Sequence, residues 1–397
     1  MSEWQTFCLK DLGKIVGGAT PSTNNPKNYG NKIAWITPKD LSTLQGRYIK
    51  KGSRSISRLG FKSCSCVLLP KHAILFSSRA PIGYVAIAKK RLCTNQGFKS
   101  IIPNKKIYFE FLYYLLKYHK DNISNIGGGT TFKEVSGATL GLFKVKIPPT
   151  YYEQQKIART LSILDQKIEN NHKINELLHK ILELLYEQYF VRFDFLDENN
   201  KPYQTSGGKM KFSKELNRLI PSGWSARFLN HKIVSTYQPK TISKTLLNDS
   251  YSYSVYGGGG IIGRFTEYNH EQSEFIISCR GQCGISYLTL PKSWITSNAM
   301  VIRPTKSYTS KTYLYHTIKK YKLTNYITGS VQPQITRQNL STIPILIPKR
   351  KTLNKWNNIS SLLWNLIHNN MQETQTLTAL RDFLLPLLLT QQVKPPK

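Results

Sequence analysis

Acidic residues are scarce in this chain. Its 397 residues include 22 Asp and Glu against 56 Lys and Arg, which gives a formal net charge of +34. A charge of this size excludes an acidic or neutral housekeeping enzyme as the default interpretation. It indicates a polyanionic partner, either nucleic acid or an anionic membrane surface.

Long hydrophobic runs are also missing. The strongest run, residues 383–389, is interrupted by Pro386, whereas a membrane-spanning helix needs about 20 apolar residues. The polar segment 1–5 has neither the basic region nor the apolar stretch of a signal peptide. We therefore expect a cytoplasmic protein with no membrane partner, which leaves nucleic acid as the polyanion.

The chain has only six cysteines, and they do not form a zinc pattern. The close pairs are Cys64 with Cys66 and Cys279 with Cys283. Neither pair is joined by the second Cys or His pair that a zinc site requires. We expect reduced, partly buried thiols and no metal site.

Catalytic motifs are absent as well. The glycine-rich segments 207–210 and 257–260 do not match a phosphate-binding P-loop. Residues 147–150 lack the polar first residue and the aromatic last residue of an amino-methyltransferase motif. Asp165 and Lys167 match part of a nuclease motif but lie in the segment with seven-residue spacing, which predicts a helix. We expect no catalytic residues.

The positive charge is concentrated in two segments. Residues 1–149 carry a net charge of +18 and residues 201–350 carry +16, whereas residues 150–200 carry −3 and residues 351–397 carry +3. Two basic segments that alternate with two nearly neutral ones indicate an internal repeat.

Sequence fragments support this periodicity at an offset near 200. The matching fragments are 78–83 with 279–284, 94–96 with 297–299, 125–130 with 325–330, and 145–148 with 345–348. Trp4 also has a counterpart in Trp224, at a larger offset. A period this long indicates two duplicated domains rather than a solenoid.

Each nearly neutral segment has apolar residues at a spacing of seven. The first series is Ile157, Leu164, Asn171, Leu178 and Leu185, and the second is Trp356, Leu363, Asn370, Leu377 and Leu384. A second stripe pairs Ile168, Ile174 and Ile181 with Ile367, Glu373 and Leu380. This spacing predicts two long helices with coiled-coil packing, and an amphipathic helix on a globular core is the alternative.

Polar residues interrupt the predicted seam. Asn171 and Asn370 occupy matching positions, where an Asn that meets another Asn fixes the register of a coiled coil at a cost in stability. Glu373 is a further defect, which marks the end of the seam or a contact with another protein. Pro386 is expected to kink or end the second helix.

The basic segments have mixed α/β character. Short apolar runs bounded by Pro, Gly and Asn predict strands at 73–78, 83–89 and 99–102 and a helix at 108–119. The second half repeats them at 274–278, 285–290, 299–303 and 312–321. Two similar basic domains on a helical spacer are typical of a protein that contacts double-stranded DNA at two half-sites.

Several fragments together resemble a known family over essentially the whole chain. They are Trp4 with Leu9 and Ile15, Gly18 with 20–21, 33–36 with Asp40, 76–83, 95–98, 147–149 with 153–154 and Ile157, and the junction Phe190, Phe193, Phe195, 208–210 and 220–224. In this order and spacing they are similar to the specificity (S) subunit of type I restriction–modification systems.

The resemblance implies an α/β (α+β) fold. Two similar target-recognition domains, 1–149 and 223–350, would alternate with two helices, 150–190 and 351–390, that pair as an antiparallel coiled coil, with a link at 191–222. Each domain would read one half of a bipartite DNA target, with an unspecified gap between the halves.

The resemblance also implies a subunit without its own catalytic site. It would bind two methyltransferase subunits and two restriction (motor–nuclease) subunits, which would carry S-adenosylmethionine, ATP and Mg²⁺. Glu153 and Gln154 have no counterpart after Pro348, where 349–351 are basic. Two alternatives follow: both helices dock partners in the same way, or each docks them differently. A free-standing two-headed DNA-binding regulator is the alternative, which the absence of a co-purifying methyltransferase would favour.

Base-reading residues follow from side-chain chemistry, because Asn and Gln suit adenine edges and Arg suits guanine. The candidates are Arg79, Asn95, Gln96, Lys99, Thr130, Thr131 and Lys133 in the first domain, and Tyr256, Arg280, Gln282, Asn298, Gln332, Gln334 and Arg337 in the second. Each of them can instead be a solvated or capping loop residue, and Trp35 and Trp294 are expected in the core rather than stacked on a ligand.

Clusters of basic residues are candidates for phosphate contacts. They are Lys50, Lys51, Arg54, Arg58 and Lys62, then Lys89, Lys90 and Arg91, then Lys319, Lys320 and Lys322. The alternative is a solvated cationic face. Carboxylates that would balance these clusters are scarce, which favours contacts to phosphate.

Overall fold

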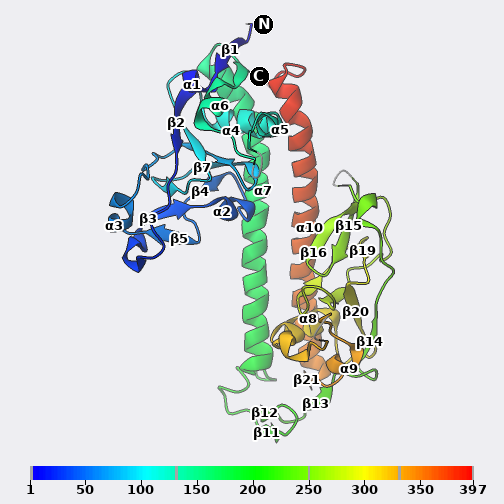
Figure 1. Ribbon diagram of the computed structural model, residues 1–397. Helices are drawn as coiled ribbons and strands as arrows, with labels where there is room; N and C mark the ends of the chain where they lie inside the picture. The colour runs from blue at the N-terminus through cyan, green and yellow to red at the C-terminus, as the bar shows by residue number, and fades with distance from the viewer. Residues whose placement is uncertain (1–2, 130–132, 249–250, 330–331, 396–397) are drawn as a thin grey trace. The chain divides into compact units, whose positions relative to one another are not determined.

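The computed structural model describes residues 3–129, 133–248, 251–329 and 332–395 (Figure 1). They belong to two compact units. The first comprises Met1–His172 with Gln372–Lys397, and the second comprises Lys173–Met371. Each unit holds one mixed α/β domain and a part of each of two long helices.

The domain of the first unit is built on antiparallel pairing with short helices. Its elements are β1 (Gln5–Cys8), α1 (Leu9–Leu12), β2 (Gly13–Gly17), η1 (Pro26–Asn28), β3 (Tyr29–Ile36), α2 (Pro38–Ser42), β4 (Tyr48–Ile49), β5 (Arg54–Ile56), α3 (Arg58–Lys62), β6 (Ile74–Ser78), β7 (Ile82–Ala88), β8 (Cys93–Thr94), β9 (Lys99–Pro103), α4 (Phe109–Tyr118), α5 (Lys120–Asn125), α6 (Gly137–Leu142) and β10 (Lys144–Ile147). The sheets have the strand orders β2-β9-β6-β7-β4, β5-β3-β8 and β1-β10.

The domain of the second unit follows a short link. The link contains β11 (Met210–Ser213) and β12 (Arg218–Pro221). The elements of the domain are β13 (Ser225–Phe228), β14 (Val234–Tyr237), η3 (Lys244–Leu246), β15 (Tyr253–Gly257), β16 (Gly260–Phe265), β17 (Phe275–Ser278), β18 (Ser286–Leu288), β19 (Trp294–Ile295), β20 (Ala299–Pro304), α8 (Lys311–Lys319), η4 (Leu323–Tyr326), α9 (Arg337–Leu340) and β21 (Pro344–Ile347). Its sheets have the orders β14-β20-β17-β18, β16-β15-β19 and β13-β21, beside the hairpin β11-β12.

Strand pairing is duplicated between the two domains. The antiparallel pairs β1–β10, β2–β9 and β6–β9 correspond to β13–β21, β14–β20 and β17–β20. The parallel pair β3–β8 corresponds to β15–β19. The internal repeat and the mixed α/β fold predicted from the sequence are therefore confirmed, and so are the predicted strands and the aromatic-rich helices α4 and α8.

Two long helices are also confirmed. They are α7 (Tyr151–Tyr186), extended by one π-helical segment, η2 (Glu187–Val191), and α10 (Arg350–Leu389). The Thr150 hydroxyl caps the start of α7, because it accepts the Glu153 N–H (3.2 Å) and donates to the Glu153 carboxylate (3.1 Å). Pro386 lies inside α10, which continues to Leu389 and ends there.

In the first unit α7 and α10 are antiparallel. Arg381 donates to Asp165 (2.7 Å), and Asn171 donates to Glu373 (2.8 Å) and Thr374 (3.3 Å). Residue numbers thus rise along α7 while those of their partners fall along α10. Glu373, the expected defect in the seam, is an acceptor for the seam residue Asn171.

In the second unit the two helices are antiparallel as well. Asn370 donates to Asn175 (2.9 Å), and Asn175 donates to the Ile367 carbonyl oxygen (3.3 Å). The rings of His179 and Trp364 meet edge to face at 5.1 Å. The contacts in both units agree with the expected antiparallel coiled coil.

The predicted seam residues are all buried or half-buried. The second stripe is wrong at three positions, because Ile174, Ile181 and Leu380 are 45%, 44% and 43% exposed. The covered row on α7 instead runs through the buried Leu161, Ile168 and Leu182 and the half-buried Asn175, which are also seven apart. The predicted stripe steps six residues from Ile168 to Ile174 instead of seven, so it departs from this row by one residue after Ile168.

The hydrophobic core of the first domain includes residues from both helices. Leu9, Phe76, Phe111 and Leu112 share a cluster with Ile157, Ala158 and Leu161 of α7 and with Leu385, Leu388 and Leu389 of α10. The domain of the first unit is therefore packed directly onto both helices of that unit.

Candidate nucleic-acid interface

Three loops of the first domain meet beside the end of β6. The Ser78 N–H donates to the Gly97 carbonyl oxygen (2.8 Å), and the Val135 N–H donates to the Ser78 carbonyl oxygen (3.0 Å). Gly128 and Glu134 exchange backbone hydrogen bonds of 3.0 and 2.9 Å. Backbone hydrogen bonds thus bring together the loops 79–81 and 94–98 and the described parts, 127–129 and 133–136, of a third loop.

These loops carry the predicted base-reading residues of the first domain. Gln96 and Lys133 are exposed, and Arg79, Asn95 and Lys99 are half-buried. Thr130 and Thr131 lie outside the described residues.

Two of these side chains already have partners within the domain. The Asn95 side chain accepts the Gly97 N–H (3.0 Å), and the Gln96 side chain accepts a hydrogen bond from the Thr20 hydroxyl. Asn95 therefore has a loop-capping role.

One carboxylate lies among the cations of this site. Lys99 donates to Glu134 Oε1 (3.2 Å), and Arg79 Nη1 lies 3.6 Å from Glu134 Oε2. Sequence reasoning missed Glu134. The sequence signal for Glu134 was the small number of carboxylates in this segment, because a carboxylate among so many basic residues has several cations as potential partners.

The second domain brings equivalent loops together. The Cys279 N–H donates to the Asn298 carbonyl oxygen (2.9 Å), and the Ile335 N–H donates to the Cys279 carbonyl oxygen (3.0 Å). Thr328 and Gln334 exchange two backbone hydrogen bonds of 2.9 Å, as Gly128 and Glu134 do. The predicted residues on these loops are all exposed, and they are Arg280, Gln282, Asn298, Gln332, Gln334 and Arg337.

Tyr256 corrects the prediction for the second domain. Its side chain is only 3% exposed, within a hydrophobic cluster that includes Ile276 and Val301. Its hydroxyl accepts the Leu290 N–H (3.0 Å). Burial raises the pKa of Tyr256 to about 12. Its strand β15 is central in its sheet, so the ring faces the core and is not on the surface as a base contact requires.

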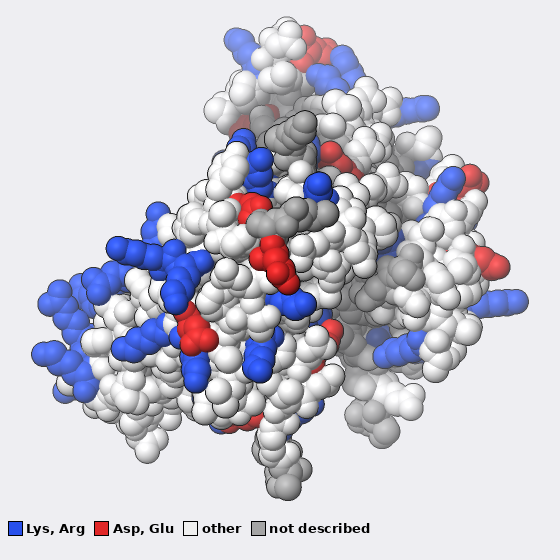
Figure 2. Space-filling view, turned by 90° about the horizontal axis from the view of Figure 1, so that it is seen from above, with Lys and Arg blue, Asp and Glu red and all other residues white. Residues whose placement is uncertain are grey.

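Basic residues gather at one end of the first domain. Lys50, Lys51, Arg54, Arg58 and Lys62, here called the basic patch, are all exposed. Figure 2 shows Lys and Arg side chains clustered on the left, the side on which Figure 1 places α3, β3 and β5. The Arg54 guanidinium lies 4.0 Å from the centre of the Tyr29 ring, which orients it. Lys89, Lys90 and Arg91 are exposed too.

Lys319 and Lys320 correct the prediction of phosphate contacts. Lys319 donates to Glu183 (2.6 Å) and Lys320 to Glu187 (3.2 Å). Both carboxylates belong to the α7–η2 segment, so these lysines attach their domain to the helix. Lys322 is exposed and remains a candidate.

The two tryptophans expected in the core differ in burial. Trp35 is 4% exposed, and its Nε1 donates to the Ala19 carbonyl oxygen (3.0 Å). Trp294 is half-buried and meets the Phe265 ring edge to face at 5.5 Å.

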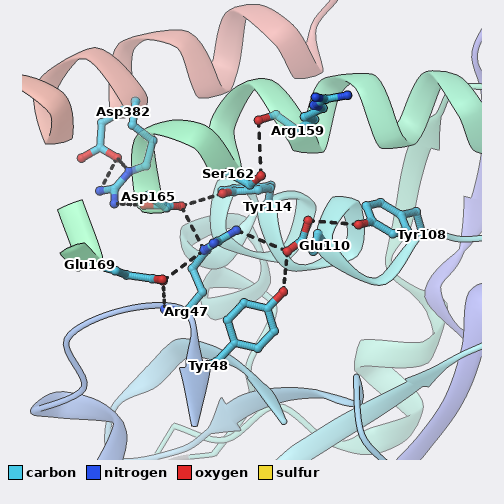
Figure 3. A network of polar contacts seen from close by, with 11 residues as sticks. Arg47, Tyr48, Tyr108, Glu110, Tyr114, Arg159, Ser162, Asp165, Glu169 and Asp382 are labelled. Carbon is cyan, nitrogen blue, oxygen red and sulfur yellow. Dashed lines mark hydrogen bonds and ion pairs between the residues drawn. The ribbon is translucent and has the colours of Figure 1, made fainter. Parts of the chain in front are cut away.

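A buried polar network anchors the first domain to the helices of its unit (Figure 3). At its centre is Arg47, just before β4, with 3% of its side chain exposed. Arg47 pairs with Glu110 of α4 (3.3 Å), Glu169 of α7 (3.2 Å) and Asp165 of α7 (3.9 Å). Burial alone would lower the pKa of Arg47, but Tyr114, Glu169 and Asp165 raise it.

Asp165 connects the network to α10. Its carboxylate accepts hydrogen bonds from the Tyr114 hydroxyl (2.6 Å) and from Arg381 (2.7 Å). Burial and the Asp165 charge both raise the pKa of Tyr114. Asp165, which matches part of a nuclease motif in the sequence, is thus a structural anchor.

The second domain is anchored differently. The Tyr186 hydroxyl of α7 donates to Thr317 of α8 (3.0 Å), and Thr312 of α8 meets Ser360 of α10 (2.8 Å). His316 of α8 lies edge to face with Trp356 of α10 at 5.3 Å. Burial lowers the pKa of His316 to about 3. Neutral aromatic contacts in the second unit replace the buried ion pairs of the first.

Gln154, which has no counterpart in the second helix, has a structural role in the first unit. Gln154 is 1% exposed, accepts the Tyr108 N–H (2.8 Å) and donates to the carbonyl oxygens of Lys106 (3.1 Å) and Pro148 (3.3 Å). It therefore braces the first domain against its helix.

Neither a metal site nor a membrane-spanning helix is found among the described residues. No group of three or more His, Cys, Asp and Glu side chains there could hold a metal ion. The six cysteines, all of them described, are free thiols. No helix in the same ranges is long and apolar enough to cross a bilayer.

Two matches to one family model cover most of the chain. The model, described as the type I restriction modification DNA specificity domain, matches residues 1–180 and 221–379. The two matches coincide with the two structural repeats.

Characterised relatives point to the same family. The chain is 32% identical to the type I restriction enzyme MjaIX specificity subunit of Methanocaldococcus jannaschii, over 99% of this chain and 94% of the relative. It is 31% identical to the type I restriction enzyme HindI specificity subunit of Haemophilus influenzae, over 46% of this chain and 40% of that one.

A solved structure shares the fold. The crystal structure of a type I restriction–modification S subunit from M. genitalium matches with a TM-score of 0.61 and 19% identity, covering 98% of this chain and 96% of that one. At this identity the match supports the fold alone.

Proposed function

Because this chain belongs to the type I restriction–modification DNA specificity family, we propose that it supplies the DNA sequence recognition of such a complex and performs no chemistry itself. The recognition domains would be residues 1–149 and 223–350. The helices 150–190 and 351–390 would carry the partner subunits, and residues 191–222 would link the two halves.

The duplicated loop clusters are the observation that carries this proposal. Each domain gathers exposed or half-buried polar and basic side chains on loops held by equivalent backbone hydrogen bonds. One duplex read by two such clusters has two half-sites, and the half-sites differ because the side chains of the two clusters differ. The target is then bipartite and asymmetric.

The helices offer a surface for protein partners. In the second unit α7 exposes Ile174, Leu177, Ile181 and Leu184, and α10 exposes Ile359, Leu362 and Leu366, here called the apolar stripe. Their spacing of three and four residues places each set on one face of its helix. Because the helices are antiparallel there, Leu177 is level with Leu366 and Leu184 with Ile359. A continuous exposed apolar surface favours a protein partner over DNA.

We assign this surface to methyltransferase subunits, two per specificity subunit, with two motor–nuclease subunits joining for restriction. S-adenosylmethionine, ATP and Mg²⁺ would belong to those partners. Within the described residues, no group of three or more His, Cys, Asp and Glu side chains could hold a metal ion.

A domain exchange tests the proposal. Residues 1–149 would be replaced by the corresponding domain of another family member, and the methylome of cells carrying the complex would be sequenced. We expect a change in one half-site and an unchanged second half-site. A change in both half-sites would contradict the two-domain assignment. Sequence-specific binding without any methyltransferase partner would favour the free-standing regulator.

A further inference from the structure

The two loop clusters differ in one charge. Glu134 and Gln334 occupy the same place in the fold, because each pairs its backbone with the residue six positions earlier, Gly128 or Thr328. Arg79 and Arg280 are equivalent too, since each follows the residue that accepts the Val135 or Ile335 N–H.

In the first domain the arginine is held by that carboxylate. Glu134 Oε1 accepts a hydrogen bond from Lys99 (3.2 Å), which leaves Oε2 to face Arg79 Nη1 at 3.6 Å. Both carboxylate oxygens thus have a cationic partner, and the Nη1 side of the guanidinium faces Glu134. The Nε–Nη2 edge of Arg79 remains for a bidentate contact of the kind that arginine makes with guanine.

In the second domain the neutral amide of Gln334 replaces the carboxylate. Both side chains, Arg280 and Gln334, are exposed, and their backbones form an isolated bridge. Lys99 has no charged equivalent there, because the matching position is the buried Met300. Within the described residues, Arg280 therefore lacks the charged brace that restrains Arg79.

A carboxylate on a DNA-facing surface has two opposite effects. It repels phosphates and offsets part of the charge of Arg79 and Lys99, which weakens binding to every DNA sequence. It also fixes the orientation of a side chain that would otherwise reach phosphates and base edges in several ways. A fixed donor edge discriminates between bases better than a mobile one.

We propose that Glu134 is the positioning residue that sets base discrimination in the first half-site, and that Gln334 leaves Arg280 a more tolerant reader in the second. This inference rests on the proposed function, because it requires both clusters to face DNA. Glu134 acts through Arg79 and need not touch a base. The class of ligand is the major-groove edge of a base pair, with guanine as the base that suits Arg79.

Reciprocal exchanges test the proposal in the complex with the methyltransferase subunits. The variants are Glu134→Gln and Gln334→Glu. Binding would be measured for the target, for every single base-pair substitution in both half-sites, and for a DNA of the same length without the target. The unfolding midpoint of each variant would be measured too, and pairs this exposed contribute little to folding stability.

For Glu134→Gln we expect discrimination at one base pair of the first half-site to fall about tenfold. Affinity for the DNA without the target should rise about twofold at low salt. The second half-site should keep its preferences. For Gln334→Glu we expect the converse, with sharper discrimination in the second half-site and weaker binding to the DNA without the target.

Unchanged base preferences in both variants would overturn the inference, since a carboxylate that merely braces a loop would leave them unaltered. If Glu134→Gln failed to fold, the unfolding midpoint would show it, and Gln334→Glu would decide the question alone. A wild-type complex with no sequence preference would instead refute the proposed function itself.

Discussion

Arg47 and Glu169 are joined twice: the backbone N–H and the Nε of Arg47 both donate to Glu169 Oε1, at 2.9 and 3.2 Å. One carboxylate on α7 thus fixes both the chain path before β4 and the direction of its arginine. The same arginine contacts α4 and the Asp165 pair with α10, so the attachment of the first domain depends on it.

Replacing Arg47 by Met should destabilise the first unit strongly. The substitution leaves the half-buried Glu110 and Glu169 without their cationic partner and leaves the buried Asp165 with Arg381 alone, at an expected cost of about 3–5 kcal/mol. Urea unfolding of the whole chain would measure it. Lys39→Ala, at an exposed position of the same domain, is the control and should change stability by less than about 0.5 kcal/mol. A destabilisation below about 1 kcal/mol for Arg47→Met would contradict this role.

Acidification should weaken the second unit. Burial lowers the pKa of His316 to about 3, whereas the unfolded chain protonates this side chain near pH 6.5. The unfolded state therefore binds more protons between these values, so stability falls as pH drops below about 6.5. The decrease should reach about 2 kcal/mol by pH 5 for this histidine.

Tryptophan fluorescence during urea unfolding suits this measurement, because Trp356 lies against His316. His316→Leu should reduce the pH dependence. The exposed His231→Ala variant should keep it. Equal pH dependence in all three proteins would show that His316 is not the responsible group.

Substitutions in the basic patch should affect DNA binding, whereas substitutions of Lys319 and Lys320 should affect the anchoring of the second domain. Replacing Lys50, Lys51 and Arg58 by Ala should weaken binding to all DNA sequences alike and lower the salt slope by about 0.9 for each phosphate that is no longer neutralised. Lys319→Ala with Lys320→Ala should leave the salt slope nearly unchanged and reduce the stability of the second unit. Titrations at several salt concentrations would decide, and weaker binding to one target sequence alone would argue against phosphate contacts.

Charges on the apolar stripe should prevent partner binding. Leu177 and Leu362 are 61% and 62% exposed, so Leu177→Asp with Leu362→Asp should change folding stability by less than about 0.5 kcal/mol per site. Association with the methyltransferase subunit should weaken at least tenfold in sedimentation experiments. Lys180→Asp introduces a similar charge at an exposed polar position of α7 and is the control. Equal affinity for all variants would remove the stripe from the docking surface.

More of the fold than of the site could be predicted from the sequence, for a physical reason. Heptad spacing and short apolar runs are local patterns, so the helices, strands and repeat could be predicted from the sequence. The second stripe was misplaced because Asn175, a polar residue, continues the covered row where Ile174 was the natural choice. An interhelical hydrogen bond from Asn175 compensates for its partial burial, and such a partner is invisible to a hydrophobic pattern.

The site was predicted only in part, because charge alone does not identify a partner. Lys319 and Lys320 were assigned to phosphate, yet their carboxylates lie more than 130 positions earlier in the chain. The roles of Glu134 and Arg47 also depend on contacts with residues far away in the sequence, which only the folded chain brings together. Tyr256 follows the polar-residue pattern of the loops but lies on a central strand.

The compact units also determine an order of assembly during synthesis. The second unit is one continuous segment, whereas the first needs Leu385, Leu388 and Leu389 to complete the core that begins at Leu9. Those leucines are translated after every residue of the second unit. The core of the first domain therefore stays incomplete until the end of α10 has been translated. The second unit has all of its residues before that point and can fold earlier.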